Sequence, residues 1–297
     1  MLSYILRRIL MLVPVLFGVT LVSFSLLHLV PGDPAELLAG LEATKEDVDR
    51  IRVEYGLDQP LAVQYARFVG NAARGDLGIS IQSRHPVREL LLQRLAFTLQ
   101  LSMVSILVAS AIGLVAGIIS ATRQYSFFDT FSMLGALFGI SMPIFWLGLL
   151  LILVFAVRLH WLPSGGAGTL RHLILPAIAL GSASAAVIAR MTRASMLEVA
   201  RQDYIRTARA TGYRESVVVF RHALKNAMIP ILTVFGLEFG YMLGGAVLTE
   251  TVFSLPGIGR LLVEGIFARD YPVVQGAMIA VATTFVLVNL LTDVAYA

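Results

Sequence analysis

The sequence predicts an all-α, polytopic membrane protein with six transmembrane helices and a helical extracytoplasmic insertion after the first span. Of its 297 residues 57% are hydrophobic and 14% are charged, with a mean hydropathy of +0.80, whereas soluble domains are about 45–50% apolar and about 25% charged. Charge-free gaps recur that are long enough for a membrane-crossing helix of roughly 20 residues. Residues 31–96 hold 18 of the charges, so the other 231 residues are poor in charge. Soluble classes are excluded, because such a chain would expose aggregating apolar patches.

The gaps between charged residues place the spans in chain order. They are 9–30, 95–122, 130–157, 172–189, the run between Lys225 and Glu250, and 271–292. Arg7 and Arg8 precede the first span as they would precede a secretory signal. Its apolar stretch is longer than the roughly 7–15 residues of a signal core, and no Ala-x-Ala site follows. We therefore interpret it as an uncleaved signal anchor.

The orientation follows from the Lys and Arg residues of the short loops. With the N-terminus inside, eleven lie on the cytoplasmic side: Arg7, Arg8, Arg123, Arg190, Arg193, Arg201, Arg206, Arg209, Arg214, Arg221 and Lys225. Four lie outside: Arg158, Arg171, Arg260 and Arg269. Both termini are therefore expected in the cytoplasm. The predicted parts are an N-terminal tail with the first span (1–30), the extracytoplasmic insertion (31–94), and a five-span core (95–297) with a cytoplasmic loop at about 190–228.

The insertion is expected to be helical and to lie as a cap on the outer mouth of the bundle. Thr44 and Asp47 have the spacing of an N-capping arrangement, and Pro60 and Pro86 suit first helical turns. Eight basic and ten acidic residues in 31–96 give it a net charge of −2.

Small residues recur at four-residue spacing in the spans, as Gly113/Gly117, Gly135/Gly139 and Gly236/Gly240/Gly244. This spacing lets helix backbones approach closely in lipid. Bundle packing is the simplest interpretation of the first two pairs. Gly236, Gly240 and Gly244 are also candidates for a movable seam along a translocation pathway.

Glu238 lies near the middle of the fifth span, where an ionisable side chain is costly and marks a candidate functional site. A proton relay, as in an ion-coupled carrier, would need an ionisable partner, and no Lys, Arg, Asp or His lies at similar depth in the other spans. The simpler interpretation is a carboxyl group that is hydrogen-bonded inside the bundle or that faces a wet cavity. Both interpretations stay open.

Enzymatic chemistry has little support in the sequence, and we expect no catalytic residue, metal site or cofactor bound by this chain. Cysteine is absent, and neither lysine, Lys45 or Lys225, follows the Gly-x-x-x-x-Gly run of an ATP-binding P-loop. Ser164 and His160 are the nearest pair to a hydrolase site, but they fall in an expected outer loop. The net charge of +4 reflects membrane topology, so no nucleic-acid partner is expected.

The stretch 190–225 holds eight basic and three acidic residues, a net charge of +5. Asp203 is predicted to cap a short helix that runs to about Thr211, and Gly212 is placed to end it. One face carries a tyrosine and small residues: Tyr204, Thr207, Ala208 and Thr211. Arg206 and Arg209 lie on another face, and a second amphipathic turn follows with Phe220 and Leu224.

A basic loop resting on anionic lipid would explain the arginines of this stretch. It would not explain the Ala/Thr face or the glycine that ends the helix. We therefore prefer a helix that is held between two spans and that transmits force when a partner protein grips it.

This loop resembles the cytoplasmic "EAA" loop of ABC importer membrane subunits, with Ala208, Gly212 and Leu224 in register. Arg206, Thr207, His222 and Lys225 depart from that pattern. Motifs along nearly the whole chain resemble the peptide/nickel permease family, and within this family they resemble the B-type subunit. The resemblance is carried by Val30-Pro-Gly-Asp-Pro-Ala35, Tyr55-Gly-Leu-Asp-Gln-Pro60, Gly75-Asp-Leu-Gly-Ile-Ser80, Ile140-Ser-Met-Pro-Ile-Phe-Trp-Leu-Gly148, Asp203-Tyr-Ile-Arg-Thr-Ala-Arg-Ala210, Thr249-Glu-Thr-Val-Phe-Ser254, Pro256-Gly-Ile-Gly-Arg260 and Arg269-Asp-Tyr-Pro-Val-Val-Gln275.

The resemblance implies a heteromeric importer in a bacterial-type inner membrane. A second homologous permease would complete the pathway, two ATPases would bind ATP and Mg and grip the loops, and an extracytoplasmic binding protein would deliver solute. Family members usually continue past the last span with a short basic tail, whereas this sequence ends at Ala297. Peptides are the expected solute, and nickel chelates and glutathione are the alternatives.

Overall fold

The computed structural model describes residues 2–29, 33–39 and 43–296, and its regular secondary structure in these residues is entirely helical. Part of the sequence motif at 30–35 and the expected end of the first span at Val30 lie outside the described residues. The chain divides into two compact units. The first comprises Met1–Thr98 and Pro256–Leu290, and the second comprises Leu99–Leu255 and Leu291–Tyr296.

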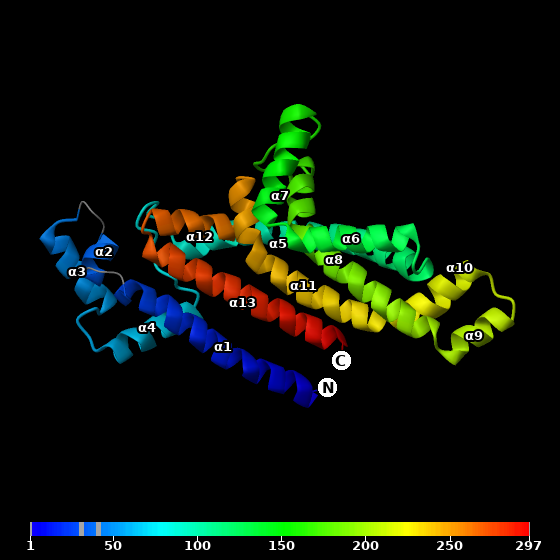
Figure 1. Cartoon of the computed structure of the whole chain (residues 1–297). Coiled ribbons are helices and arrows are strands. Elements are labelled where there is room, and N and C mark those ends of the chain that lie inside the picture. Colours follow the sequence, from blue (N-terminus) through cyan, green and yellow to red (C-terminus); the bar gives the residue numbers. More distant parts are fainter. Residues whose placement is uncertain (1, 30–32, 40–42, 297) are drawn as a thin grey trace. The chain divides into compact units, whose positions relative to one another are not determined.

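The first unit contains the N-terminal helix, the insertion and most of the last helix (Figure 1). Its helices are α1 (Leu2–Leu29), α2 (Pro34–Ala39), α3 (Lys45–Tyr55), α4 (Leu61–Ala73), the beginning of α5 (Val87–Thr122), α12 (Ile258–Phe267) and most of α13 (Tyr271–Tyr296). Val87 and Leu91 of α5 pack with Ile258 of α12 and with Val273 and Ala277 of α13 in a buried hydrophobic cluster. This cluster joins the beginning of α5 to the C-terminal helices α12 and α13 inside the unit.

The local signals of the insertion are confirmed. Thr44 caps α3 in a reciprocal capping box with Asp47, and the hydrogen bonds from Thr44 hold the pKa of the Asp47 carboxyl below its usual range. Pro60 occupies the N-cap position of α4. The insertion is nevertheless not only a solvated cap, because Tyr65 of α4 contacts Phe17 and Thr20 of α1.

An Asp270 carboxylate fastens a second part of the insertion. It is buried beside the start of α13, where it accepts hydrogen bonds from the Ser80 hydroxyl and from the backbone N–H groups of Ile81 and Gln82. An isolated bridge between Ile79 and Pro86 closes the same loop. A buried carboxylate needs such donors, so this loop has a fixed place in the unit.

The second unit is a helical bundle built around α8 (Arg171–Ala200). Its other elements are the greater part of α5 (from Leu99), α6 (Phe127–Ser141), α7 (Ile144–Leu151), the π-helix η1 (Ile152–Arg158), α9 (Asp203–Ala210), α10 (Glu215–Val217), the π-helix η2 (Val218–Ala223) and α11 (Leu224–Val252). α8 packs against α6, α7 and α11. Of its most apolar window 67% is buried, against 28% for the α10–α11 segment, so α8 is the central helix.

Close backbone approach explains one of the glycine pairs. A Cβ atom added at Gly113 or Gly117 of α5 would stand 2.7 Å from the Ala185 carbonyl oxygen or 2.6 Å from that of Ala189 on α8. No atom lies within 4 Å of the corresponding position at Gly135. The Gly113/Gly117 pair therefore serves helix packing, as expected.

Among the described residues, five helical segments are long and apolar enough to cross a membrane, and a bent pair of helices supplies a sixth candidate. The expectation of a single third span over 130–157 is wrong in form, because α6 and the helix that begins at Ile144 are bent by 106°. The break lies at Met142-Pro143, where Met142 has the extended conformation (φ −81°, ψ 126°). Steric clash disfavours the helical region for a residue before proline, so the proline in this charge-free stretch marks the bend.

Candidate functional site

The short helix α9 connects α8 to the segment that enters α11, as expected for the 190–228 loop (Figure 1). Its beginning differs from the prediction. Gln202 is the N-cap residue, without a side-chain cap hydrogen bond, and Asp203 is the first helical residue. An acidic residue there still interacts favourably with the helix dipole, but Asp203 does not cap the helix.

Gly212 ends this helix, as predicted. Its backbone adopts the left-handed conformation, with φ +83°, and its N–H donates to the Arg209 carbonyl oxygen while the Tyr213 N–H donates to that of Ala208. Nothing lies within 4 Å of a Cβ added at this position. The backbone conformation, rather than crowding, is therefore what favours glycine here.

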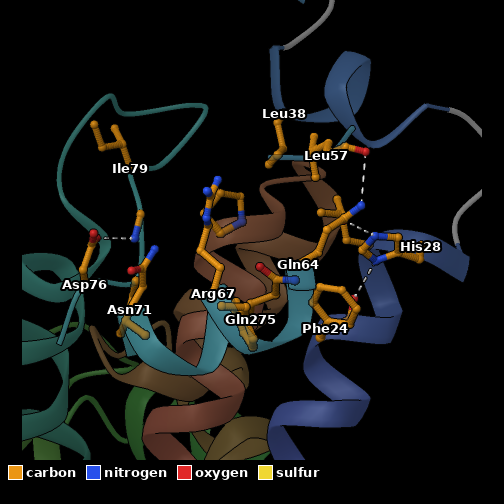
Figure 2. A pocket seen from close by; sticks show the side chains of 15 residues that line it. Phe24, His28, Leu38, Leu57, Gln64, Arg67, Asn71, Asp76, Ile79 and Gln275 are labelled. Carbon is orange, nitrogen blue, oxygen red and sulfur yellow. Dashed lines mark hydrogen bonds between the residues drawn. The ribbon is translucent and has the colours of Figure 1, made fainter. Parts of the chain in front are cut away.

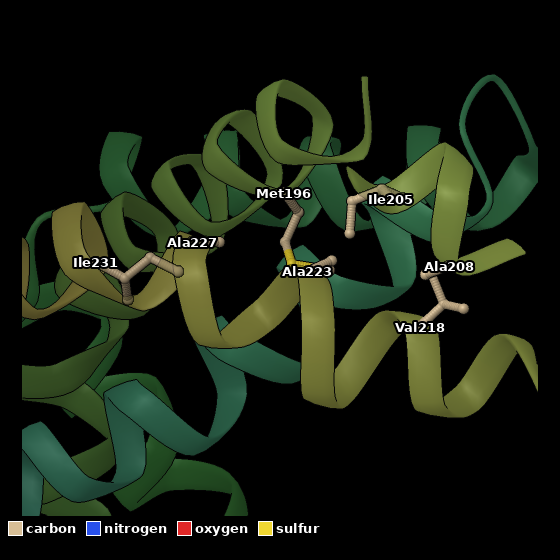
Figure 3. Packing of buried hydrophobic residues seen from close by; sticks show 7 residues of the cluster. All are labelled: Met196, Ile205, Ala208, Val218, Ala223, Ala227 and Ile231. Carbon is tan, nitrogen blue, oxygen red and sulfur yellow. The ribbon is translucent and has the colours of Figure 1, made fainter. Parts of the chain in front are cut away.

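The inner face of α9 is buried and anchors the helix. From the sequence, Ile205 was not identified as part of this face, and Ala208 was assigned to the face of Tyr204. Ile205 is fully buried and Ala208 nearly so, and both belong to a cluster with Met196 of α8 and with Val218 and Ala223 of η2 (Figure 3). Ala208 was expected on the same face as Tyr204. Ile205 lies three residues before Ala208, and this i, i+3 pair is the hydrophobic signal that could have identified the anchor.

The two residues of the predicted second amphipathic turn, Phe220 and Leu224, also differ in burial. Leu224 is partly buried against the anchor cluster, so it is a packing residue and not part of an exposed docking surface. Phe220, by contrast, is 60% exposed. Val218 and Ala223, on either side of it in the sequence, are buried, and so η2 presents Phe220 outward while its other face holds α9.

The outer surface of α9 is polar and aromatic. Tyr204, Arg206, Thr207, Thr211 and Gly212 are exposed. We call these residues, together with Phe220, the α9 outer surface. Of these six residues only Arg206 is charged.

Two polar links hold the helix at its edges. The Asn226 side-chain amide donates a 2.8 Å hydrogen bond to the Tyr204 hydroxyl, which joins α9 to α11. The Arg209 guanidinium makes a bidentate contact with the Glu215 carboxylate of α10, with the shorter N–O distance 2.8 Å. With the Ile205 anchor, these contacts tie α9 to α10 and to the adjoining ends of α8 and α11.

Sequence reasoning missed a polar link deeper in the same unit. The Asp129 carboxylate at the start of α6 pairs with Arg193 of α8 through two N–H···O bonds of 2.8 and 2.9 Å. It also accepts hydrogen bonds from the Ser120 hydroxyl and the Tyr125 N–H. The Asp129 side chain is 7% exposed and that of Arg193 26%. A charge-free gap was taken to begin after Asp129, and no sequence spacing paired it with Arg193.

The pathway candidates on α11 do not form one surface. A Cβ atom at Gly236 would collide with the Thr292 side chain, whereas Gly244 is exposed and has nothing within 4 Å. Gly240 is buried. The half-buried Glu238 accepts a hydrogen bond from the Ser184 hydroxyl of α8. The glycines therefore face different surroundings, and Glu238 takes part in contact between α8 and α11.

Comparisons with known proteins cover almost the whole chain. The family model described as "Binding-protein-dependent transport system inner membrane component" matches residues 113–297, and the model of the corresponding N-terminal region matches residues 1–102. The dipeptide transport system permease protein DppB of Alkalihalophilus pseudofirmus is 47% identical, and the glutathione transport system permease protein GsiC of Escherichia coli K12 is 48% identical. Each match covers 100% of this chain and 97% of the relative.

Solved structures share the fold. A chain of the methionine ABC transporter MetNI in an inward-facing conformation superposes with a TM-score of 0.60 at 20% sequence identity, over 70% of this chain and 94% of that chain. An amino acid ABC transporter crystallised with histidines gives 0.53 at 16% identity, over 70% and 91% of the two chains.

Proposed function

This chain belongs to the family of inner membrane components of binding-protein-dependent transport systems, and from that membership we propose that it is the permease subunit of an ABC importer for di- and oligopeptides. In this proposal it forms half of the translocation pathway and couples to separate ATPase subunits. The relative named for dipeptide transport, 47% identical over the whole chain, supports peptides as the solute. The relative named for glutathione, at 48%, supports glutathione as the alternative within the same machine, and nickel chelates are the remaining alternative.

The observation that carries the coupling role is the way α9 is held. Its inner face is buried in one cluster with α8, η2 and α11, while Tyr204, Arg206 and Phe220 face outward. A partner that binds the α9 outer surface and shifts it must displace both flanking helices, because pulling Ile205 out of the cluster would expose a buried isoleucine at a cost of about 2–5 kcal/mol. ATP-driven closure of the partners would thereby be converted into alternating access.

The proposal implies a defined set of partners and a defined location. They are a second homologous permease, two ATPase subunits that bind ATP and Mg, an extracytoplasmic substrate-binding protein, and the lipid bilayer of a bacterial-type inner membrane. Both termini lie in the cytoplasm, and so does α9. This chain binds no cofactor and hydrolyses no nucleotide by itself.

Reconstitution of the complete importer with its binding protein tests this function. ATP-dependent uptake should be compared for dipeptides, longer peptides, glutathione and a nickel chelate. We expect dipeptide uptake that stops when ATP or the binding protein is omitted. Uptake driven by a proton gradient without the ATPases would favour an ion-coupled carrier that uses Glu238. Nucleotide hydrolysis by the purified chain alone would contradict the division of labour.

A further inference from the structure

A cavity of about 320 Å³ lies within the first unit, apart from the coupling region. It is lined by the C-terminal turns of α1, by α4 and the loop after it, and by the first turn of α13 (Figure 2). Its walls combine aromatic and aliphatic side chains with a few polar groups, the composition of a site for an amphiphilic ligand.

Most polar groups in the wall are already satisfied. The His28 ring nitrogen Nε2 lies 3.0 Å from the Gln64 side-chain oxygen, and the Gln64 amide donates to two backbone carbonyl oxygens. The Gln275 amide donates to the Ser23 carbonyl oxygen of α1. Asp76 accepts from the Gly78 N–H. These contacts hold the walls together, while the second Asp76 oxygen and the Gln275 side-chain oxygen have no hydrogen bond within the described residues.

Arg67 and Asn71 differ from them. The two residues lie one helical turn apart on α4, so their side chains share a face, and both line the cavity. Within the described part of the chain, the Arg67 guanidinium has no ion pair or hydrogen bond, and the Asn71 side-chain amide has no hydrogen bond. Among the residues that the structure describes, the cavity therefore offers one cation without an ion pair and one side-chain amide without a hydrogen bond.

The apolar wall adjoins α1, an apolar helix that is little buried in the structure. The Phe24 ring of α1 contacts the Phe68 ring of α4 in a tilted arrangement, with ring centroids 5.8 Å apart, and Leu27 completes this side. Only 11% of the apolar window of α1 is buried. The cavity thus lies beside an apolar surface that a bilayer would cover.

The depth of α4 also fits a membrane boundary. Its contacts with α1 extend from Phe17 to His28, which corresponds to about 17 Å along a helix, close to the roughly 15 Å of half a hydrocarbon core. Leu61 and Val63 of α4 are exposed although apolar. An amphipathic helix at this depth contacts acyl chains with such residues, while a long basic side chain reaches toward the headgroups.

We propose that this cavity binds a phospholipid of the leaflet that the C-terminal end of α1 reaches, with its phosphate at Arg67 and Asn71 and an acyl chain against Phe24 and Phe68. The proposed function enters only in assigning this leaflet to the extracytoplasmic side. A free phosphate would have the same headgroup chemistry, but an exposed arginine alone gives less than about a tenfold gain in affinity. The apolar wall therefore favours the lipid as the source of the phosphate.

The test measures phosphatidylglycerol retained by the purified, fully assembled importer in native mass spectrometry. Arg67→Gln should reduce retention up to about fivefold, because Arg67 is exposed and an exposed charge pair contributes up to about 1 kcal/mol. Arg67→Lys should keep much of it, since lysine still binds phosphate as a point charge. Arg74→Gln is the matched control: Arg74 ends the same helix, is exposed and does not line the cavity, so retention should match that of the parent protein.

Competition separates the sources of the ligand. Inorganic phosphate and a dipeptide should not displace the lipid. Displacement by phosphate would identify a simple anion site, displacement by the dipeptide would identify a solute site, and equal retention by Arg67→Gln and the parent would show that Arg67 does not bind the headgroup. Each of these results would overturn the proposal. Arg67-dependent retention in a complex that fails to import peptides would contradict the proposed function and leave the lipid site standing.

Discussion

At the scale of single residues, Gly212 sets the path of the chain at the end of α9. Its φ of +83° turns the chain out of α9 and toward α10. An L-residue in the left-handed region costs roughly 1–2 kcal/mol, with β-branched residues worst and asparagine best tolerated. Space is not limiting, because nothing lies within 4 Å of an added Cβ.

We expect Gly212→Val to uncouple solute uptake from ATP hydrolysis or to prevent ATPase assembly, because the end of α9 must change its path. Gly212→Asn should keep most of the coupled uptake. Uptake and ATP hydrolysis by the reconstituted complex measure both. Gly135→Ala is the control, since this helical glycine faces open space. Normal coupling in Gly212→Val would argue strongly against the role given to α9.

The same residues show what a sequence can predict. The glycine stop was predicted because few residues tolerate that backbone conformation. Capping by Asp203 was wrong because an acidic residue suits both the cap and the first turn. The anchor Ile205 was missed because four apolar or small residues in an eight-residue helix fit more than one face, and burial depends on Met196 and Val218 from other elements.

At the scale of elements, α8 organises the second unit, and its link to α6 is ionic. Arg193 and Asp129 form a bidentate pair whose carboxylate is buried. Removing one partner of a buried pair leaves an uncompensated charge, whereas removing both can cost little. The link therefore fixes where α6 begins relative to α8.

Arg193→Gln should lower the free energy of unfolding by about 3 kcal/mol, the low end of the range for buried pairs because Arg193 is partly exposed. Combining it with Asp129→Asn should restore part of the loss. Thermal unfolding of the purified complex measures this. Arg50→Gln is the matched control, since Arg50 and Asp47 form an exposed ion pair on α3, so its effect should stay below about 1 kcal/mol. If Arg193→Gln and the exposed control variant lowered the free energy of unfolding equally, the buried ion pair would not have the role given to it here.

The presence of the membrane-spanning helices was easier to predict than their bends and their packing. Five of the expected spans correspond to long helices, because charge-free runs report directly on burial in lipid. The bend at Pro143 was not predicted, since the apolar run continues through it. Packing of α4 against α1 was also missed, because contacts such as Tyr65 with Phe17 join residues far apart in the sequence.

At the scale of the whole molecule, we assign the membrane spans and α9 to this chain and ATP hydrolysis to partner chains. The described helices offer spans, a buried anchor and an exposed α9 outer surface, and nucleotide chemistry is assigned to partners. The absence of cysteine in this chain allows single cysteines to be introduced on a background without native thiols. Arg206 and Asp58 are suitable positions, because both are exposed and belong to different units.

The most direct test is cross-linking of Arg206→Cys to a single cysteine on an ATPase subunit in complexes that import peptide. The account predicts a covalent adduct for Arg206→Cys and none for Asp58→Cys. A membrane-impermeant maleimide added outside should label Asp58→Cys alone. An ATPase adduct at Asp58→Cys, or outside labelling of Arg206→Cys with no adduct, would contradict the claim that α9 receives the mechanical work of the ATPases.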